Sequence, residues 1–195
     1  MSKGDETRLA VLEQAVEVAR RVGLGGLTIG TLAEQARLSK SGLFAHFRSK
    51  EALQLAVIEH ACTEFQAAVA RPTLRAARGE ARVRELFERW LEWDSRPGGC
   101  PFIAAATEFD DQPGAVRDQL VRDLRDLFDM IATVFRTGIS EGQFRPDTDP
   151  EQFAQDFYGV ILASHHAQRL FGDKRAALRA RHSLEALLAD ARVTA

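Results

Sequence analysis

The spacing of apolar residues constrains the fold of this chain more than any other feature. Apolar side chains recur at intervals of three and four along most of the sequence, beginning with Leu9, Leu12, Val16, Ala19 and Val22. This period places them on one face of an α-helix. No alternating pattern long enough for a β-strand interrupts it. The sequence therefore predicts an all-α protein of about nine helices.

Short helices joined by tight turns are predicted near the amino terminus. The first helix ends at the glycine-rich segment 23–26, and Thr28 and Ser39 are suitable N-caps for the second and third. Only residues 37–38 lie between the second and third helices. Such a tight junction of two short helices is typical of a helix-turn-helix.

The rest of the chain is also predicted to be helical. A fourth helix runs from the N-cap Ser49 to Pro72, which ends or kinks it, and residues 71–79 mark a boundary in function. Later helices are separated by breaks at residues 97–99, 110–114 and 138–142. The final two helices carry apolar stripes, predicted as Phe153, Phe157, Val160, Ser164 and Gln168 on one and Leu178, Leu184, Leu187, Leu188 and Ala191 on the other.

Composition indicates a soluble globular protein. The 195 residues are 45% hydrophobic, which is enough for a substantial core. The chain opens without the apolar segment of a secretion signal, and charged residues break every long apolar run, so we expect a cytoplasmic protein with no membrane contact. Cys62 and Cys100 are too few for a disulfide framework or a zinc site. No metal and no cofactor is predicted.

The net charge of -2 hides an uneven distribution. Residues 1–50 contain eight Lys or Arg and five Asp or Glu, a balance of +3, and the remainder of the chain carries -5. A modestly basic head on an acidic body is compatible with a small DNA-binding unit attached to a part that does not bind DNA.

The stretch from Leu27 to Leu53 reads LTIGTLAEQARLSKSGLFAHFRSKEAL. It closely resembles the helix-turn-helix of TetR/AcrR-type transcription regulators. The resemblance covers about the first fifty residues, and beyond them it extends only to overall length and helix pattern. It implies a three-helix DNA-binding domain over residues 1–50, with a reading helix at about 39–47. A larger helical domain for ligand binding and dimerisation would occupy residues 51–195.

A reading helix needs one buried face and one face free for the major groove. Leu43 and Phe47, four residues apart, supply the buried face. The resemblance implies that the DNA-binding residues are Thr28, Ser39, Lys40, Ser41, Gly42, Phe44, His46 and Lys50. Lys40 can donate to guanine, and Lys50 to a phosphate. The chain departs from the family pattern at Phe44, where relatives often have Tyr, and at Gly30, which offers no side chain to the groove.

Aromatic residues from successive predicted helices form a candidate wall for an apolar or aromatic ligand. The predicted pocket residues are Phe87, Trp90, Trp93, Phe102, Glu108, Phe109, Phe128, Phe135 and His165. For each aromatic residue taken alone, an ordinary hydrophobic core is the better explanation, whereas the family resemblance favours the existence of a pocket. His165 and His166 are adjacent on a helix and point about 100 degrees apart, so they are poorly placed to chelate one metal ion.

The resemblance also implies that the last two helices pair with their copies about a two-fold axis. The predicted interface residues are Phe157, Ile161, Leu184, Leu187 and Leu188. The alternative is that these helices close the core of their own chain.

We therefore expect a ligand-responsive DNA-binding regulator rather than an enzyme. The expected mode is a homodimer that represses transcription from a palindromic double-stranded operator and leaves it when a small apolar or aromatic molecule binds. Two alternatives stay open. One is a dimeric ligand-binding module without DNA reading, and the other is a helical enzyme using Cys100 or His165.

Overall fold

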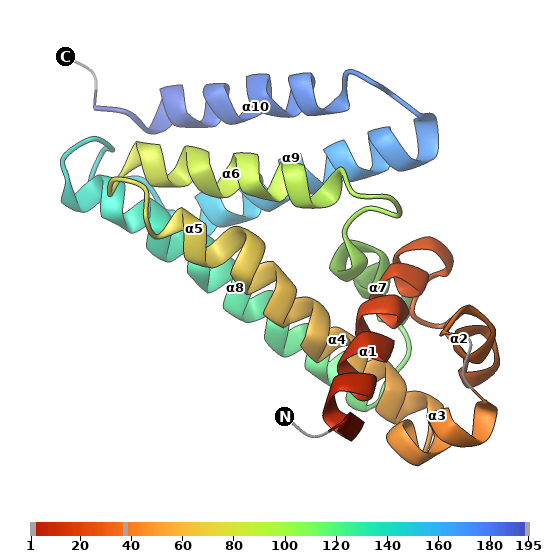
Figure 1. Cartoon of the computed structure of the whole chain (residues 1–195). Coiled ribbons are helices and arrows are strands. Elements are labelled where there is room, and N and C mark those ends of the chain that lie inside the picture. The colour runs from red at the N-terminus through yellow and green to blue at the C-terminus, as the bar shows by residue number, and fades with distance from the viewer. Residues whose placement is uncertain (1–2, 37–38, 194–195) are drawn as a thin grey trace. The chain divides into compact units, whose positions relative to one another are not determined.

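A computed structural model describes residues 3–36 and 39–193, and within these ranges the chain is all-α, as predicted (Figure 1). The described residues include nine helices of eight or more residues: α1 (Lys3–Val22), α2 (Ile29–Ala36), α3 (Lys40–Phe47), α4 (Lys50–Phe65), α6 (Glu80–Asp94), α7 (Pro101–Phe109), α8 (Ala115–Ser140), α9 (Pro150–Phe171) and α10 (Ala176–Ala191). None of these helices is both long enough and apolar enough to cross a bilayer.

Three predicted N-caps are confirmed at the starts of α2, α3 and α4. Thr28 Oγ1 accepts from the Thr31 amide at 3.0 Å, while Thr31 Oγ1 accepts from the Thr28 amide at 3.0 Å. Ser39 Oγ accepts from the amide of Gly42 at 3.1 Å. Ser49 Oγ accepts from the amide three residues on at 3.0 Å. Each cap satisfies an amide that the helix itself leaves without an acceptor.

The end of the fourth predicted helix differs from the expectation. After α4 the chain continues as a π-helical turn, Gln66–Ala70, and then as a three-residue α-helical turn, α5 (Arg71–Thr73). Pro72 lies in this last turn rather than beyond the helix. Proline is tolerated there because it occupies the first turn of α5, where a missing amide costs little.

The chain divides into two compact units. The first comprises residues 1–64 and 96–123, and the second comprises residues 65–95 and 124–195. Segment 96–123, which holds α7 and the start of α8, therefore packs with the amino-terminal helices. Fully buried apolar residues of the first unit include Ala15, Leu27, Leu32, Leu43 and Leu53. The predicted functional division at residue 50 is a different division of the chain and stays a prediction.

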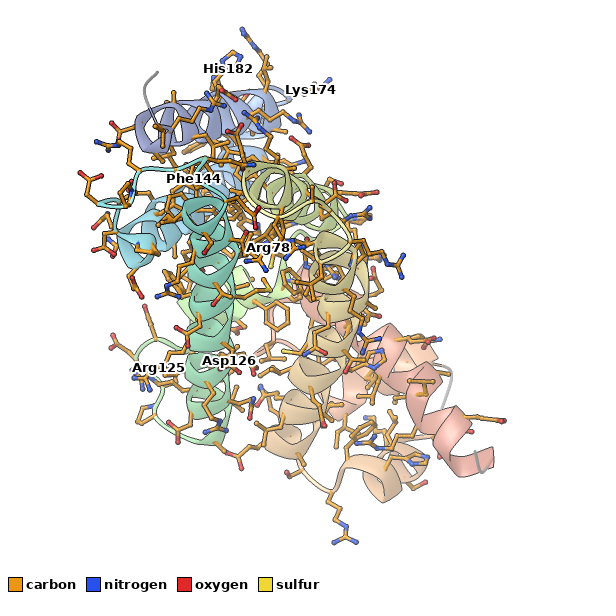
Figure 2. The ribbon with its side chains drawn as sticks, turned by 90° about the vertical axis from the view of Figure 1, so that its left-hand side faces the viewer. Arg78, Arg125, Asp126, Phe144, Lys174 and His182 are labelled. Carbon is orange, nitrogen blue, oxygen red and sulfur yellow. The ribbon has the colours of Figure 1, made fainter. Side chains whose placement is uncertain are left out.

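The second unit has an aromatic core. The Phe135 ring of α8 stacks on the rings of Phe144 and Phe153, with centroids 4.6 and 4.0 Å away. Figure 2 shows Phe144 at the end of α8, while Arg125 and Asp126 lie exposed along that helix. Gly138 allows Phe144 to approach closely, since a Cβ atom there would lie 2.2 Å from the ring. Stacked rings of this kind contribute beyond their burial alone.

The carboxy terminus is tied into the second unit by an ion-pair network. Arg192 donates to Glu80 at 2.7 and 2.8 Å and to Glu185 at 2.8 Å, and Arg84 donates to Glu80 at 2.8 Å. The hydrogen bonds from Arg192, followed by those from Arg84, lower the pKa of Glu80 from 4.5 to about 2. The charged form of Glu80 therefore stabilises the folded state.

This network predicts a pH-dependent stability. Because the pKa of Glu80 is lower in the folded chain, its contribution is complete above pH 4.5 and is lost as the pH falls towards about 2. At pH 7 we expect Glu80→Gln to lower the free energy of unfolding by about 1 kcal/mol. Urea denaturation at pH 7 and pH 3 checks this, and the difference between wild type and variant must shrink at the lower pH. An equal difference at both pH values would contradict the assignment.

Candidate nucleic-acid interface

The two faces of α3 differ in burial. Leu43 and Phe47 are buried against the rest of the first unit, whereas Lys40 and Ser41 are exposed and Gly42 is half-buried. The Ser39 hydroxyl lies 3.1 Å from that of Ser41. Lys40 and its neighbours therefore form a polar edge at the amino-terminal end of α3. That end is the part of a reading helix that meets base edges in a helix-turn-helix.

The side chain of Lys40 lies beside Gly30 of α2. A Cβ atom at position 30 would lie 3.8 Å from Lys40 Cε and 3.9 Å from Lys40 Nζ, which is ordinary van der Waals contact. The end of the lysine therefore lies against the start of α2.

Lys50, the first residue of α4, is exposed and has a contact that the sequence did not suggest. Its Nζ donates to the carbonyl oxygen of Gly25, in the turn between α1 and α2, at 2.5 Å. An ammonium group has three donors, so this bond leaves two for a phosphate. The hydrogen bond to Gly25 therefore positions Lys50 and still leaves N–H donors for a further contact.

The remaining predicted DNA contacts are placed unevenly. Thr28 and His46 are half-buried, and the His46 ring lies 6.2 Å from that of Phe47. The side chain of Phe44 lies outside the described part of the chain. Arg48, which the sequence analysis did not single out, is exposed directly after α3 with a positive φ of 39°. Its place beside Ser49 and Lys50 adds a further cation to this edge.

Arg8 of α1 also lies close to the reading helix. Its guanidinium carbon is 5.5 Å from the centroid of the Phe47 ring. A contact of this type is worth about 0.5–1 kcal/mol when exposed. Arg8 was missed because nothing in the sequence indicates which residue of the first helix faces the third.

Glu108 has a backbone partner that the sequence analysis did not indicate. Its Oε1 accepts from the Gly25 amide at 2.8 Å, within the first unit. Phe102 and Phe109 of α7 belong to the same unit and are buried. One oxygen of Glu108 is therefore engaged by the turn before α2, and its place in a ligand pocket stays a prediction. Gly25 was read only as a helix-ending residue, because its partner lies 83 positions away.

The other six predicted pocket residues lie in the second unit, where most are packed ring against ring. Phe157 contacts Phe87 and Trp90, with centroids 5.3 and 6.2 Å apart. Trp90 and Trp93 both pack edge-on against Phe65, at 5.5 and 5.6 Å. Further ring contacts include Phe128 with Tyr158 at 5.0 Å and Phe135 with Phe153 at 4.0 Å. These aromatic residues form a core, and whether a ligand enters it stays a prediction.

His165 and Asp94 form a buried hydrogen-bonded pair. Its Nδ1 lies 2.7 Å from Oδ1 of Asp94, and the two residues are 5% and 3% exposed. The ring of His166 is 5.8 Å from that of His165 and half-buried. Asp94, the last residue of α6, thus fixes the orientation of the imidazole. The sequence did not indicate this partner, which is 71 positions distant.

Four of the five predicted interface residues are buried in their own chain and need correction. Phe157, Ile161, Leu184 and Leu188 are 0–3% exposed, so they offer no surface to a second copy. They close the core between α9, α10 and their neighbours instead. Leu187 alone is half-exposed. The predicted stripe on α9 is also shifted, since Gln168 is exposed and Ile161 is buried in its place.

The outer face of α9 and α10 is grooved and lined mainly by small residues. The groove has a volume of about 820 Å³. Its lining includes Gly159, Ala163, Ala167, Ser183, Ala186 and Leu187. Beyond its end, Leu170 and Phe171 are 72% and 79% exposed. Exposed apolar side chains next to an apolar groove mark a surface suited to protein association.

Sequence comparisons identify both parts of this arrangement. A model of the tetracyclin repressor-like C-terminal domain matches residues 79–184. A second model, of bacterial regulatory proteins of the tetR family, matches residues 11–57. Among curated relatives, the HTH-type transcriptional repressor NicS of Pseudomonas putida is 27% identical over 146 residues, which are 74% of this chain and 69% of NicS.

Solved structures share the fold along nearly the whole chain. A TetR transcriptional regulator from Chloroflexus aurantiacus is 25% identical, with a TM-score of 0.87 and full coverage of both chains. AibR in complex with isovaleryl coenzyme A and operator DNA is 22% identical, with a TM-score of 0.76, and the match covers 93% of this chain and 98% of AibR.

Proposed function

The chain belongs to the TetR family of bacterial transcription regulators, and we propose that it is a homodimeric repressor of a palindromic operator that a small ligand releases. In this proposal residues 1–50 bind DNA, and residues 51–195 bind the ligand and form the dimer. The repressor NicS, a relative over three quarters of the chain, supports repression rather than activation.

The observation that carries the proposal is the polarity of α3. Leu43 and Phe47 bury one face of α3, while its first turn presents Lys40 and Ser41 on a capped helix start. Lys50 and Arg48 extend this edge with positive charge. A helix held in this way can lie in the major groove, with Lys40 near base edges and Lys50 near a phosphate.

Ligand binding is proposed for the aromatic part of the second unit. AibR, which shares the fold, was solved with isovaleryl coenzyme A and operator DNA together. Here Trp90 supplies a further reason, because its indole nitrogen is buried and has no hydrogen-bond acceptor among the described residues. Buried donors are generally paired, so an acceptor from outside the chain would complete this site. The aromatic surroundings favour an apolar or aromatic compound with one polar atom.

Dimerisation is proposed through the outer face of α9 and α10. The groove there is lined by residues small enough for a second helix pair to approach closely, and Leu170 and Phe171 beside it need cover. In a two-fold interface each surface meets its own copy. Two copies would also supply the two reading helices that a palindromic site requires.

Lys40→Ala and Lys50→Ala are expected to weaken operator binding in different ways. Each loss is about tenfold, the scale of one charged contact to DNA. Lys40→Ala lowers the preference for operator over random DNA. Lys50→Ala weakens both by a similar factor and reduces the slope of log affinity against log salt by about one. Fluorescence anisotropy on a fragment from upstream of the gene measures the affinity, the preference over competitor DNA and, over a salt series, the slope.

The matched control is Lys174→Ala, an exposed lysine outside the head, which should change nothing. Sedimentation of the complex counts the chains bound, and two per palindrome are expected. A wild-type chain that binds no genomic fragment better than random DNA would overturn the proposal. The chain would then be a ligand-binding module without DNA reading.

A further inference from the structure

The backbone of Gly25 is hydrogen-bonded on both sides of its Cα atom. Its N–H donates to Glu108 Oε1 of α7 at 2.8 Å, and its carbonyl oxygen accepts from Lys50 Nζ of α4 at 2.5 Å. All three residues lie in the first unit. This one residue thus connects a residue of α7 to the lysine proposed to bind a phosphate. We call Glu108, Gly25 and Lys50 the turn clamp.

The carboxylate of Glu108 occupies space that a side chain on Gly23 or Gly25 would fill. A Cβ atom on Gly25 would lie 2.1 Å from Glu108 Oε1, and one on Gly23 would lie 3.1 Å from Oε2. Gly23 also has a φ of 81°, which side chains rarely adopt. The Glu108 carboxylate can therefore sit directly against the backbone of the turn.

The turn that carries Gly25 fixes other parts of the head. Gln54 of α4 is buried and donates from Nε2 to the carbonyl oxygen of Leu24 at 3.0 Å. Thr28, three residues beyond Gly25, caps α2. Contacts from α7 and α4 thus meet on consecutive residues of one turn. A change at Glu108 that moves this turn would therefore also affect Lys50 and the start of α2.

We infer that Glu108 is a positioning residue for DNA binding, which acts by holding the Gly25 amide, and with it the Gly25 backbone, so that the carbonyl oxygen of Gly25 anchors Lys50. This inference rests on the proposed function. Without this hydrogen bond, the flexible Lys50 side chain would sample more conformations, and its ammonium group would spend less time in the position proposed to contact a phosphate. Residues 95–100 join α6 to α7, which carries Glu108. A ligand that displaced α7 would therefore move Glu108 away from Gly25, break the turn clamp and free Lys50.

The test is operator binding over a salt series for Glu108→Ala, Lys50→Ala and the double variant. Glu108→Ala should weaken binding about five- to tenfold and lower the salt slope by up to one, as Lys50→Ala does. Because both changes remove the same phosphate contact, the double variant should bind about as well as Lys50→Ala alone. Glu108→Gln should bind nearly as well as wild type, since its amide oxygen still accepts from Gly25.

Thr107→Ala is the matched control, because Thr107 is the exposed neighbour of Glu108 and its hydroxyl bonds within its own helix. It should leave affinity and slope unchanged. If Glu108→Ala does not fold, Glu108→Asp, whose shorter side chain keeps the charge but shortens the reach to Gly25, replaces it with the same expectation.

Two results would overturn the inference while leaving the proposed function intact. One is a Glu108 variant with reduced thermal stability but wild-type affinity and salt slope. The other is a double variant whose loss equals the product of the two single losses, because the residues would then act independently. A wild-type chain without operator binding would instead overturn the proposed function and this inference with it.

Discussion

Asp94→Ala is expected to lower the free energy of unfolding by about 3 kcal/mol, because it leaves the imidazole of His165 buried without its carboxylate partner. The pair spans 2.7 Å between Nδ1 and Oδ1, and neither residue is more than 5% exposed. Removing one member keeps the cost of burying the other and loses the attraction between them. Urea denaturation at a fixed protein concentration measures the change, since a dimer's apparent stability depends on concentration.

The controls separate burial from charge pairing. Asp94→Asn keeps an acceptor for the imidazole and should lose only about 1 kcal/mol. Arg181→Ala removes an ion pair to Glu88 whose side chains are 48% and 46% exposed, and should lose less than about 0.5 kcal/mol. The variant lacking both Asp94 and His165 should lose less than the two single losses combined. An Asp94→Ala protein as stable as wild type would show that the pair does not stabilise the fold.

Most of the local structure of this chain was predictable from the sequence. Helix starts followed from Thr28, Ser39 and Ser49, because a side-chain oxygen at that position satisfies amides of the first turn whatever the rest of the chain does. The buried face of α3 followed from Leu43 and Phe47, because a spacing of four residues selects one side of a helix. These features depend on neighbours in sequence.

The role of individual apolar residues in the last two helices was not predictable. Phe157, Ile161, Leu184 and Leu188 have the spacing of an interface stripe, yet their own chain buries them. Both α9 and α10 carry one apolar face for the core and a second, smaller one lined by Gly, Ala and Ser. A periodic pattern does not show which face is covered by the same chain.

Contacts between polar groups far apart in the sequence were not predictable either. Glu108 was predicted as a polar group that could orient a ligand, and its hydrogen-bond partner, a backbone amide 83 positions earlier, was not predicted. A backbone group has no signature in the sequence. The hydrogen bonds of Gly25 with Glu108 and Lys50 depend on the packing of α7 and α4 against one turn, which only the structure shows.

Gly98→Ala is expected to cost more than any other single change considered, about 4 kcal/mol in free energy of unfolding. Gly98 has a φ of 92°, and a Cβ atom there would lie 2.5 Å from Arg20 Cβ and 2.6 Å from the Arg20 carbonyl oxygen. Both obstacles are backbone or backbone-attached atoms of α1, which cannot swing aside as the end of a side chain does. The loop would have to move away from α1.

Such a movement would also disturb a buried arginine. Arg20 is 1% exposed, and its Nη1 donates to the carbonyl oxygen of Gly99 at 2.5 Å. Desolvation lowers the pKa of this guanidinium, so the charge is held at a cost that its hydrogen bonds offset. Shifting Gly99 lengthens that bond, which adds to the steric cost at Gly98.

Gly142→Ala is the matched control for this prediction. Gly142 also has a positive φ, 69°, but nothing lies within 4 Å of an added Cβ atom. It should therefore lose only the conformational strain, about 1 kcal/mol. Denaturation curves of the two variants, measured together, isolate the effect of the close approach to α1. Equal losses would mean that the loop before α7 yields easily, and that its contact with Arg20 does little to hold α7 against the DNA-binding head.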